Sequence, residues 1–241
     1  MRIFYRTDTG RVRSSNQDSA ACGEFDGGCW GVVCDGMGGT NGGDIASSIA
    51  VEMIGEELSA IMNSQLEGEQ IRAVISSAVD RANARIYSMA RMDDALYGMG
   101  TTVVCAVRID SRIYVAHAGD SRAYLMGEDG INRLTTDHSM VQELVDLGRI
   151  TPEEALNHPR KNVITRALGV VPEIAVDHGE YEAGENDIVL LCSDGLTNCV
   201  SEAEMLAMAR KLPLDELCGE YIDTANNNGG YDNITALVIG K

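Results

Sequence analysis

Residues 30–47 read WGVVCDGMGGTNGGDIAS, so an apolar segment runs directly into Asp35 and a series of glycines. Residues 187–198 read DIVLLCSDGLTN and repeat the pattern, with Asp194 and a glycine after the apolar run. Short apolar runs rich in β-branched residues and bounded by Gly, Asp or Ser are typical of strands. Each stretch therefore predicts a buried strand that ends in a carboxylate. Taken alone, either Asp-Gly pair predicts no more than a turn.

Length and composition set the size of the core. The chain has 241 residues, 44% of them hydrophobic and only 5% aromatic, so we expect a core of small aliphatic side chains. This length fits one large domain or two small ones. The sequence contains no low-complexity linker and no internal repeat, which favours a single domain over residues 1–241.

The net charge of the chain limits the classes of molecule that it is expected to bind. The chain carries 19 Lys and Arg against 37 Asp and Glu, a formal net charge of -18. Nucleic acids and anionic membrane surfaces favour basic partners, so both are excluded as expected ligands. The acidity fits either solubility or cation binding, and composition does not separate the two.

The cysteines and the N-terminal residues indicate the compartment. Seven cysteines are scattered along the chain without a C-x-x-C pair, and Cys34, Cys105 and Cys192 lie inside apolar runs. This pattern predicts buried free thiols in a reducing compartment. The first residues lack the apolar region of a signal peptide, and no apolar run is long enough to cross a bilayer. We expect a soluble, cytoplasmic protein with no membrane insertion.

The remaining pattern predicts alternating blocks of strands and helices. Residues 110–135 resemble an antiparallel meander with a hairpin turn at 128–130. Apolar residues recur at three- and four-residue steps over 45–61 and 71–86, which predicts two helices. Two short helices separated by Gly148 are expected within 139–157, and two more over 201–211 and 214–226. Further strands are expected at 29–35, 101–109, 112–119, 187–193 and 234–240. Together these elements predict one α+β domain built on antiparallel sheets.

Four carboxylates share one position relative to the strands. Asp35, Asp120 and Asp194 follow apolar runs, and Asp232 precedes the last one. Hard cations such as Mg²⁺ and Mn²⁺ bind oxygen ligands, and acids at strand ends project from a rigid sheet. A glycine after the acid lets its backbone carbonyl approach the same ion. The four acids together make a divalent-cation site a hypothesis to weigh against four separate turns.

Other catalytic motifs are absent from the sequence. It has no P-loop, no G-x-G-x-x-G after a strand, no H-E-x-x-H and no G-x-S-x-G elbow. The four histidines lack zinc spacing, and no cysteine is followed six positions later by an arginine. The acids are too dispersed for an EF-hand.

The order of the motifs makes the chain similar to protein phosphatases of the PPM (PP2C-type) family, in their compact bacterial form. No single motif is specific, but eight occur in the family's order between about residues 13 and 239. They are RVRSSNQDS, CDGMGGTNGGDIAS, GMGTTVV, HAGDSRAYL, TTDHS, HPRKNVITRALG, CSDGLTN and GGYDNITALVI.

The resemblance implies a fold and a metal site. The fold is a four-layer αββα sandwich, two central antiparallel sheets flanked by helices, with a small helical flap at about 140–161. The cofactors are two core Mn²⁺ or Mg²⁺ ions plus a weaker third. Asp35, Asp194 and Asp232 would hold the first ion, Asp35 and the Gly36 carbonyl the second, and Asp120 with Asp194 the third.

The resemblance also implies an activity. The enzyme would hydrolyse phosphoserine and phosphothreonine in proteins with a metal-bridged hydroxide. Arg13 would clamp the phosphate, because its planar guanidinium matches two phosphate oxygens, and Asp18 would hold metal-bound water. The expected partners are phosphorylated proteins and an opposing bacterial serine/threonine kinase, and the expected state is a monomer.

The sequence departs from the family motifs at two positions, and three alternative functions stay open. Bacterial relatives read DGMGGH where this chain has Thr40 in sixth place, and Met37 occupies the place of a histidine proposed as general acid in eukaryotic members. A thioether cannot donate a proton, so the general acid stays unassigned. The alternatives are a phosphatase dedicated to one regulatory partner, a phosphoprotein-binding relative with little activity, and a small-molecule phosphatase.

Overall fold

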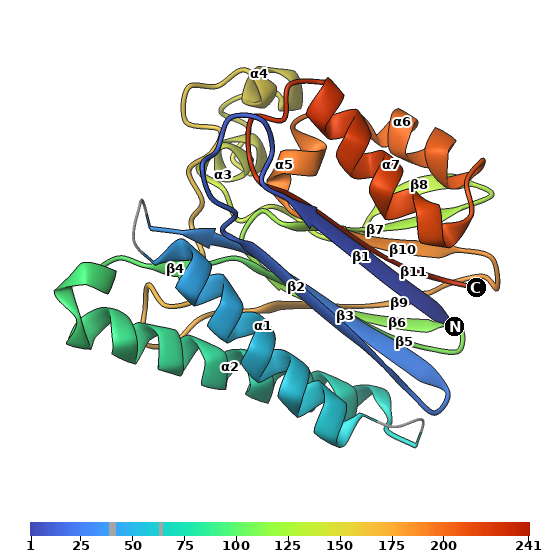
Figure 1. The fold of residues 1–241 in the computed structure, drawn as a ribbon, viewed down its shortest axis with the longest axis horizontal. Helices are drawn as coiled ribbons and strands as arrows, with labels where there is room; N and C mark the ends of the chain where they lie inside the picture. The colour runs from blue at the N-terminus through green and yellow to red at the C-terminus, as the bar shows by residue number, and fades with distance from the viewer. Residues whose placement is uncertain (39–41, 63–64) are drawn as a thin grey trace.

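Two antiparallel sheets form the centre of the molecule in a computed structural model that describes residues 1–38, 42–62 and 65–241 (Figure 1). The first sheet has the order β1 (Arg2–Asp8), β11 (Ile234–Gly240), β10 (Ile188–Cys192), β7 (Arg122–Gly127) and β8 (Gly130–Arg133). The second has the order β2 (Asp18–Phe25), β3 (Gly28–Met37), β5 (Val103–Ile109), β6 (Arg112–Ala118) and β9 (Asp177–Glu182), and β4 (Gly100–Thr101) pairs with the end of β3.

Helices cover both outer faces of this pair of sheets, so the predicted four-layer αββα sandwich is confirmed. The second sheet is covered by α1 (Gly43–Ile61) and α2 (Gly68–Met92), which is followed by a short 3₁₀ turn, η1 (Asp94–Leu96). The first sheet is covered by α5 (Asp194–Thr197), α6 (Glu202–Ala209) and α7 (Leu214–Asn227). Figure 1 shows α3 (Met140–Asp146) and α4 (Pro152–Leu156) at the end of the sandwich away from both termini.

The central strands are apolar throughout because they are buried on both faces. In β3, Trp30 and Val32 pack in the cluster under α1 and α2, whereas Val33 packs between the sheets. In β11, Val238 packs toward α7 and Leu237 between the sheets. Successive side chains of a strand point to opposite faces, so two packed faces require an unbroken apolar run. This explains why the opening stretch shows no alternation.

Two expectations from the sequence need correction. β6 and β7 do not form a meander, because β6 pairs with β5 and β9 while β7 pairs with β10 and β8. The chain crosses from one sheet to the other between them, at residues 119–121. The hairpin turn that joins β7 to β8 is present as predicted. In α1, Ala46 and Ala50 face the core, whereas Ile45 and Ile61 of the predicted apolar stripe are exposed.

The two short helices expected within 139–157 are present and begin at capping residues. The Ser139 hydroxyl accepts from the backbone N–H of Gln142 at the start of α3. At α4, Thr151 and Glu154 form a reciprocal capping box that spans Pro152. Such caps satisfy backbone donors that a short helix leaves free, which stabilises helices too short to form alone.

The cysteines are free thiols, and Cys34, Cys105 and Cys192 are fully buried as predicted. Burial raises the pKa of the Cys105 and Cys192 thiols to about 12, which keeps both protonated. None of the helices in the described ranges is long and apolar enough to cross a membrane.

Candidate active site

The sequence-predicted acids meet in one cleft of about 690 Å³ at the edge of the sandwich. They reach it from both sheets, because Asp35 lies near the end of β3, Asp120 follows β6, Asp194 opens α5 and Asp232 precedes β11. Arg13 and Gly36 line the same cleft, together with Met37 and residues 162–164 beyond α4. All predicted site residues except Asp18 therefore lie on the cleft wall.

Asp18 lies directly behind the cleft, where it connects the two sheets. It stands opposite Asp35 in the β2–β3 register. Its Oδ2 accepts hydrogen bonds of 2.7 Å from the Ser193 and Thr235 hydroxyls, which belong to the other sheet. Its Oδ1 is buried and has no hydrogen-bond partner among the described residues. One oxygen is thus fixed by the fold, while the other keeps its full capacity as an acceptor.

The glycines after Asp35 and Asp194 allow close backbone approach. A Cβ on Gly36 would lie 2.0 Å from the Gly43 carbonyl oxygen at the start of α1. A Cβ on Gly195 would lie 2.0 Å from the Asn233 carbonyl oxygen beside Asp232. Any other residue would push these segments apart. The glycine of each Asp-Gly pair therefore lets its segment pack directly against the backbone of another segment of the cleft, and this places the preceding aspartate beside that backbone.

Arg13 pairs with Asp232 at the mouth of the cleft. Its Nη2 donates to Asp232 Oδ2 over 2.7 Å, and this hydrogen bond is the largest influence that raises the pKa of the guanidinium. The other carboxylate oxygen of Asp232 accepts from the Asn233 backbone N–H. The Arg13 side chain is 53% exposed, so it can exchange this partner for a ligand entering from solvent.

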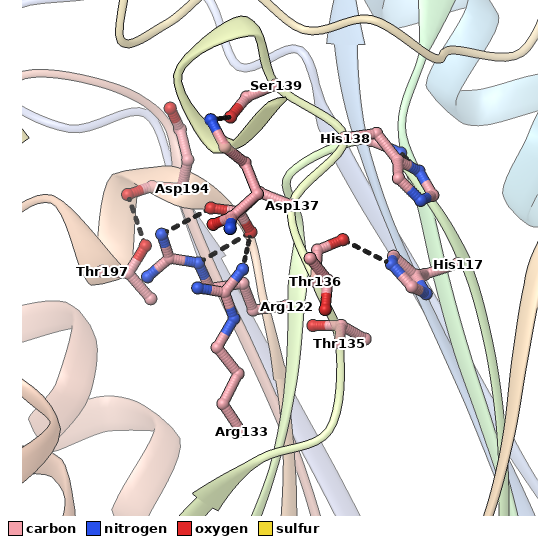
Figure 2. A network of polar contacts seen from close by, with 12 residues as sticks. His117, Arg122, Arg133, Thr135, Thr136, Asp137, His138, Ser139, Asp194 and Thr197 are labelled. Carbon is pink, nitrogen blue, oxygen red and sulfur yellow. Dashed lines mark hydrogen bonds and ion pairs between the residues drawn. The ribbon is translucent and has the colours of Figure 1, made fainter. Parts of the chain in front are cut away.

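Asp120 lies on the segment that crosses between the sheets, and it lines a cavity together with a paired set of charges. Figure 2 shows these charges, Arg122, Arg133 and Asp137. Arg122 donates two hydrogen bonds of 3.0 and 2.7 Å to the two oxygens of Asp137, and Arg133 also pairs with Asp137. Such bidentate pairs fix geometry as well as charge. Asp120 and Asp194 thus face a cavity whose nearby arginines are already engaged by Asp137.

The cleft carboxylates repel one another. Burial, followed by the neighbouring carboxylates, raises the pKa of Asp18 and Asp120 from 3.8 to about 7 and that of Asp194 to about 6. The same causes raise the pKa of Asp35 well above its ordinary value. Arg13 and Arg122 oppose this only partly, and they lower the pKa of Asp194. A cation in the cleft would reverse the repulsion.

The residues present fit a divalent cation of the hard class. The donors are carboxylate oxygens, and the Oδ1 atoms of Asp18 and Asp194 are buried without hydrogen-bond partners within the described ranges. Buried polar atoms are almost always paired, so two orphaned oxygens in one cluster indicate missing ligands. Mn²⁺ and Mg²⁺ prefer such oxygen sets.

Sequence reasoning missed the hydroxyls of Ser193 and Thr235 that hold Asp18. Ser193 directly precedes Asp194 and Thr235 lies three residues after Asp232, but nothing in the sequence says which acid a hydroxyl will face. Asn16 and Asn233 brace loops: Asn16 Nδ2 donates to the Thr7 hydroxyl, and Asn233 Nδ2 donates to the carbonyls of Thr9 and Ser15. Thr40, the departure from the bacterial motif, lies outside the described residues.

The comparisons with known proteins identify the family of the chain. The family model described as protein phosphatase 2C matches residues 9–237. The chain is similar to the serine/threonine phosphatase stp of Listeria innocua, at 41% identity over all of this chain and 96% of the relative.

Two solved structures are similar over almost their full length. One is a serine/threonine phosphatase of S. agalactiae, with 36% identity, a TM-score of 0.92 and coverage of 100% of this chain and 99% of that one. The other is the catalytic domain of the protein phosphatase PstP in complex with two manganese ions, with 33% identity, a TM-score of 0.84 and coverage of 98% and 96%. The chain belongs to the protein phosphatase 2C family.

Proposed function

We propose that this protein hydrolyses phosphoserine and phosphothreonine in proteins with a binuclear Mn²⁺ or Mg²⁺ centre, and that it opposes a bacterial serine/threonine kinase. The observation that carries the proposal is the meeting of Asp35, Asp120, Asp194 and Asp232 in one cleft beside Arg13. We further propose that residues 1–241 act as one domain, with 140–161 as a flap, and that the protein is a monomer.

Each side chain has a role that follows from its position. Asp35, Asp194 and Asp232 would hold the core ions with the Gly36 carbonyl, and Asp120 with Asp194 a weaker third ion. When bound, such ions lower the pKa of water and supply the attacking hydroxide. The orphaned Oδ1 of Asp194 supports this ligand set.

Arg13 and Asp18 would bind and orient rather than transfer protons. Arg13 is exposed enough to leave Asp232 and offer its planar fork to the phosphate oxygens of a substrate. Asp18 has one oxygen fixed by two hydroxyls, so its free Oδ1 has a defined direction in which to accept a hydrogen bond from water. Met37 lines the cleft but has no proton to give, so the leaving oxygen takes its proton from another donor.

The decisive experiment compares wild type with Asp194→Asn on a phosphothreonine peptide, with and without Mn²⁺. We expect activity that requires Mn²⁺, and a loss of about 100-fold or more in the variant because a ligand of two ions is removed. Activity that persists in chelator, or a variant that matches wild type, would overturn the metal mechanism. Mn²⁺ binding without turnover on any phosphopeptide would instead favour the phosphoprotein-binding alternative.

A further inference from the structure

The segment that carries Asp120 is held from behind by a histidine. Gly119 and His138 exchange two hydrogen bonds: the His138 backbone N–H donates to the Gly119 carbonyl over 2.9 Å, and the Gly119 N–H donates to His138 Nδ1 over 3.2 Å. Gly119 is the residue before Asp120 and adopts φ +113, where the chain turns from one sheet to the other. Both the backbone and the ring of His138 therefore fix the start of this turn.

The ring of His138 has a defined protonation state. Nδ1 accepts from Gly119, so the ring hydrogen must be on Nε2, which donates to Asp177 Oδ2 over 3.2 Å. Arg166 donates to the other oxygen of Asp177 over 2.7 Å and orients that carboxylate. Burial is the largest influence on His138 and lowers its pKa, which favours the neutral ring. Only the neutral ring can accept from Gly119 and donate to Asp177 at the same time.

A metal site is the competing explanation for this cluster. Ligand atoms of His117, His138 and Asp177 all lie within 4.8 Å of one another. However, both nitrogens of His138 are engaged, and His117 Nε2 lies 2.8 Å from the Thr136 carbonyl, to which it must donate. The two rings stack with centroids 4.6 Å apart and planes 12° apart, which does not aim their nitrogens at one point. The hydrogen bonds therefore favour a structural role for this cluster, in which His138 holds Gly119, over a cation site.

The cluster of His117, His138 and Asp177 lies on one side of residues 135–139, and the catalytic cleft lies on the other. Figure 2 shows Asp137 turned toward Asp194 and Arg122, while His138 is turned the opposite way toward His117. The His138 carbonyl also accepts from Thr165, and Ser139 bridges to Ile164, which lines the cleft. His138 thus connects the Asp120 turn to the segment that returns from α4.

We propose that His138 is a positioning residue, whose ring holds Gly119 and thereby sets where the Asp120 carboxylate enters the cleft. The inference rests on the proposed role of Asp120 as a ligand of the weaker ion. It adds a residue of the TTDHS motif to the machinery without placing it against substrate or metal.

Two amide variants separate the roles of the two ring nitrogens of His138. In His138→Asn the amide oxygen takes the place of Nδ1 and can still accept from Gly119. In His138→Gln the amide nitrogen takes the place of Nε2 and the acceptor is lost. We expect calorimetric Mn²⁺ titration to show about 10- to 100-fold weaker binding at the Asp120-dependent site in His138→Gln, as for other residues that orient a ligand. His138→Asn should retain most of the affinity.

Three further variants make the result decisive. Asp120→Asn identifies which part of the titration depends on Asp120. His117→Gln removes the stacked ring but keeps a donor for Thr136, so it should leave Mn²⁺ affinity unchanged even where melting temperature falls. Asp177→Ala, which serves if His138→Gln does not fold, removes the acceptor of the His138 Nε2 hydrogen and should weaken the same site.

The outcomes distinguish this inference from the proposed function. If Asp120→Asn leaves Mn²⁺ binding unchanged, Asp120 is not a ligand, so its proposed role and the positioning role of His138 both fail, whereas hydrolysis by the core ions still stands on the Asp194→Asn test. If Asp120→Asn weakens binding but His138→Gln does not, only the positioning role is wrong. Equal losses in His138→Asn and His138→Gln, or an equal loss in His117→Gln, would show that packing alone is responsible and would also overturn it.

Discussion

Arg13 donates to Asp232, so the residue proposed to bind phosphate also neutralises a proposed metal ligand. Replacing it tests which role dominates. In Arg13→Ala we expect kcat/KM on a phosphopeptide to fall about 10- to 100-fold, because a charged hydrogen bond to phosphate is lost. Stability should change by less than about 0.5 kcal/mol in urea unfolding, since the pair is largely exposed.

A matched variant separates charge from shape at this position. Arg13→Lys keeps the cation but loses the planar fork, so it should recover only part of the activity. Mn²⁺ affinity should not fall in Arg13→Ala, because the competing cation on Asp232 has been removed. Turnover equal to wild type in both variants would show that Arg13 does not bind the phosphate.

Among the elements, α5 packs closely against the start of β11 because Gly195 has no side chain. Gly195→Ala should lower the free energy of unfolding by about 1–3 kcal/mol, because the new methyl group overlaps the Asn233 carbonyl. It should also weaken Mn²⁺ binding, since Asp194 and Asp232 are displaced relative to each other. Urea unfolding and Mn²⁺ titration measure the two effects.

The chain offers a control for that substitution. Gly219 lies within α7, where the nearest atom to a new Cβ is 3.4 Å away at the end of the flexible Arg6 side chain. Gly219→Ala should stabilise the protein by up to about 1 kcal/mol through helix propensity, without altering Mn²⁺ binding. Equal effects of the two substitutions would contradict the packing role of Gly195.

The elements also show how far sequence reasoning reaches. β3, β5, β10 and β11 were predictable because burial on both faces leaves an unmistakable apolar run. β1 and β9 were not, because they lie at sheet edges and carry charged residues. The crossing at 119–121 has the sequence pattern of a meander, since a turn between two strands does not reveal which sheet the second strand joins. The acids of the cleft were visible as strand-end carboxylates, but the hydroxyls and the histidine behind them depend on contacts between distant segments.

At the scale of the whole molecule, the carboxylate cluster makes stability depend on pH when metal is removed. Folding raises the pKa of Asp18 and Asp120 to about 7 and of Asp194 to about 6, from 3.8. Groups with raised pKa values contribute stability below about pH 4, and this contribution is lost as pH rises to about 7. In chelator, Asp120→Asn should therefore be more stable than wild type at pH 7.5, and its advantage should shrink as pH falls toward 4.

Thermal unfolding of both proteins across this pH range measures the difference. Mn²⁺ at pH 7.5 should raise the melting temperature of wild type more than that of Asp120→Asn, because ligands that bind only the folded state stabilise it. An advantage of the variant that does not vary with pH would mean that carboxylate repulsion is not its cause.

The first and last strands are hydrogen-bonded neighbours, with Arg2 opposite Gly240. Residues 1 and 241 therefore lie close together, at the end of the sandwich away from α3 and α4 (Figure 1). A circular permutant could join residues 1 and 241 with a short linker and open instead at the exposed Glu128–Asp129 turn. Mn²⁺-dependent turnover by such a permutant would show that the catalytic cleft depends on which strands are adjacent, and not on the order in which the ribosome makes them.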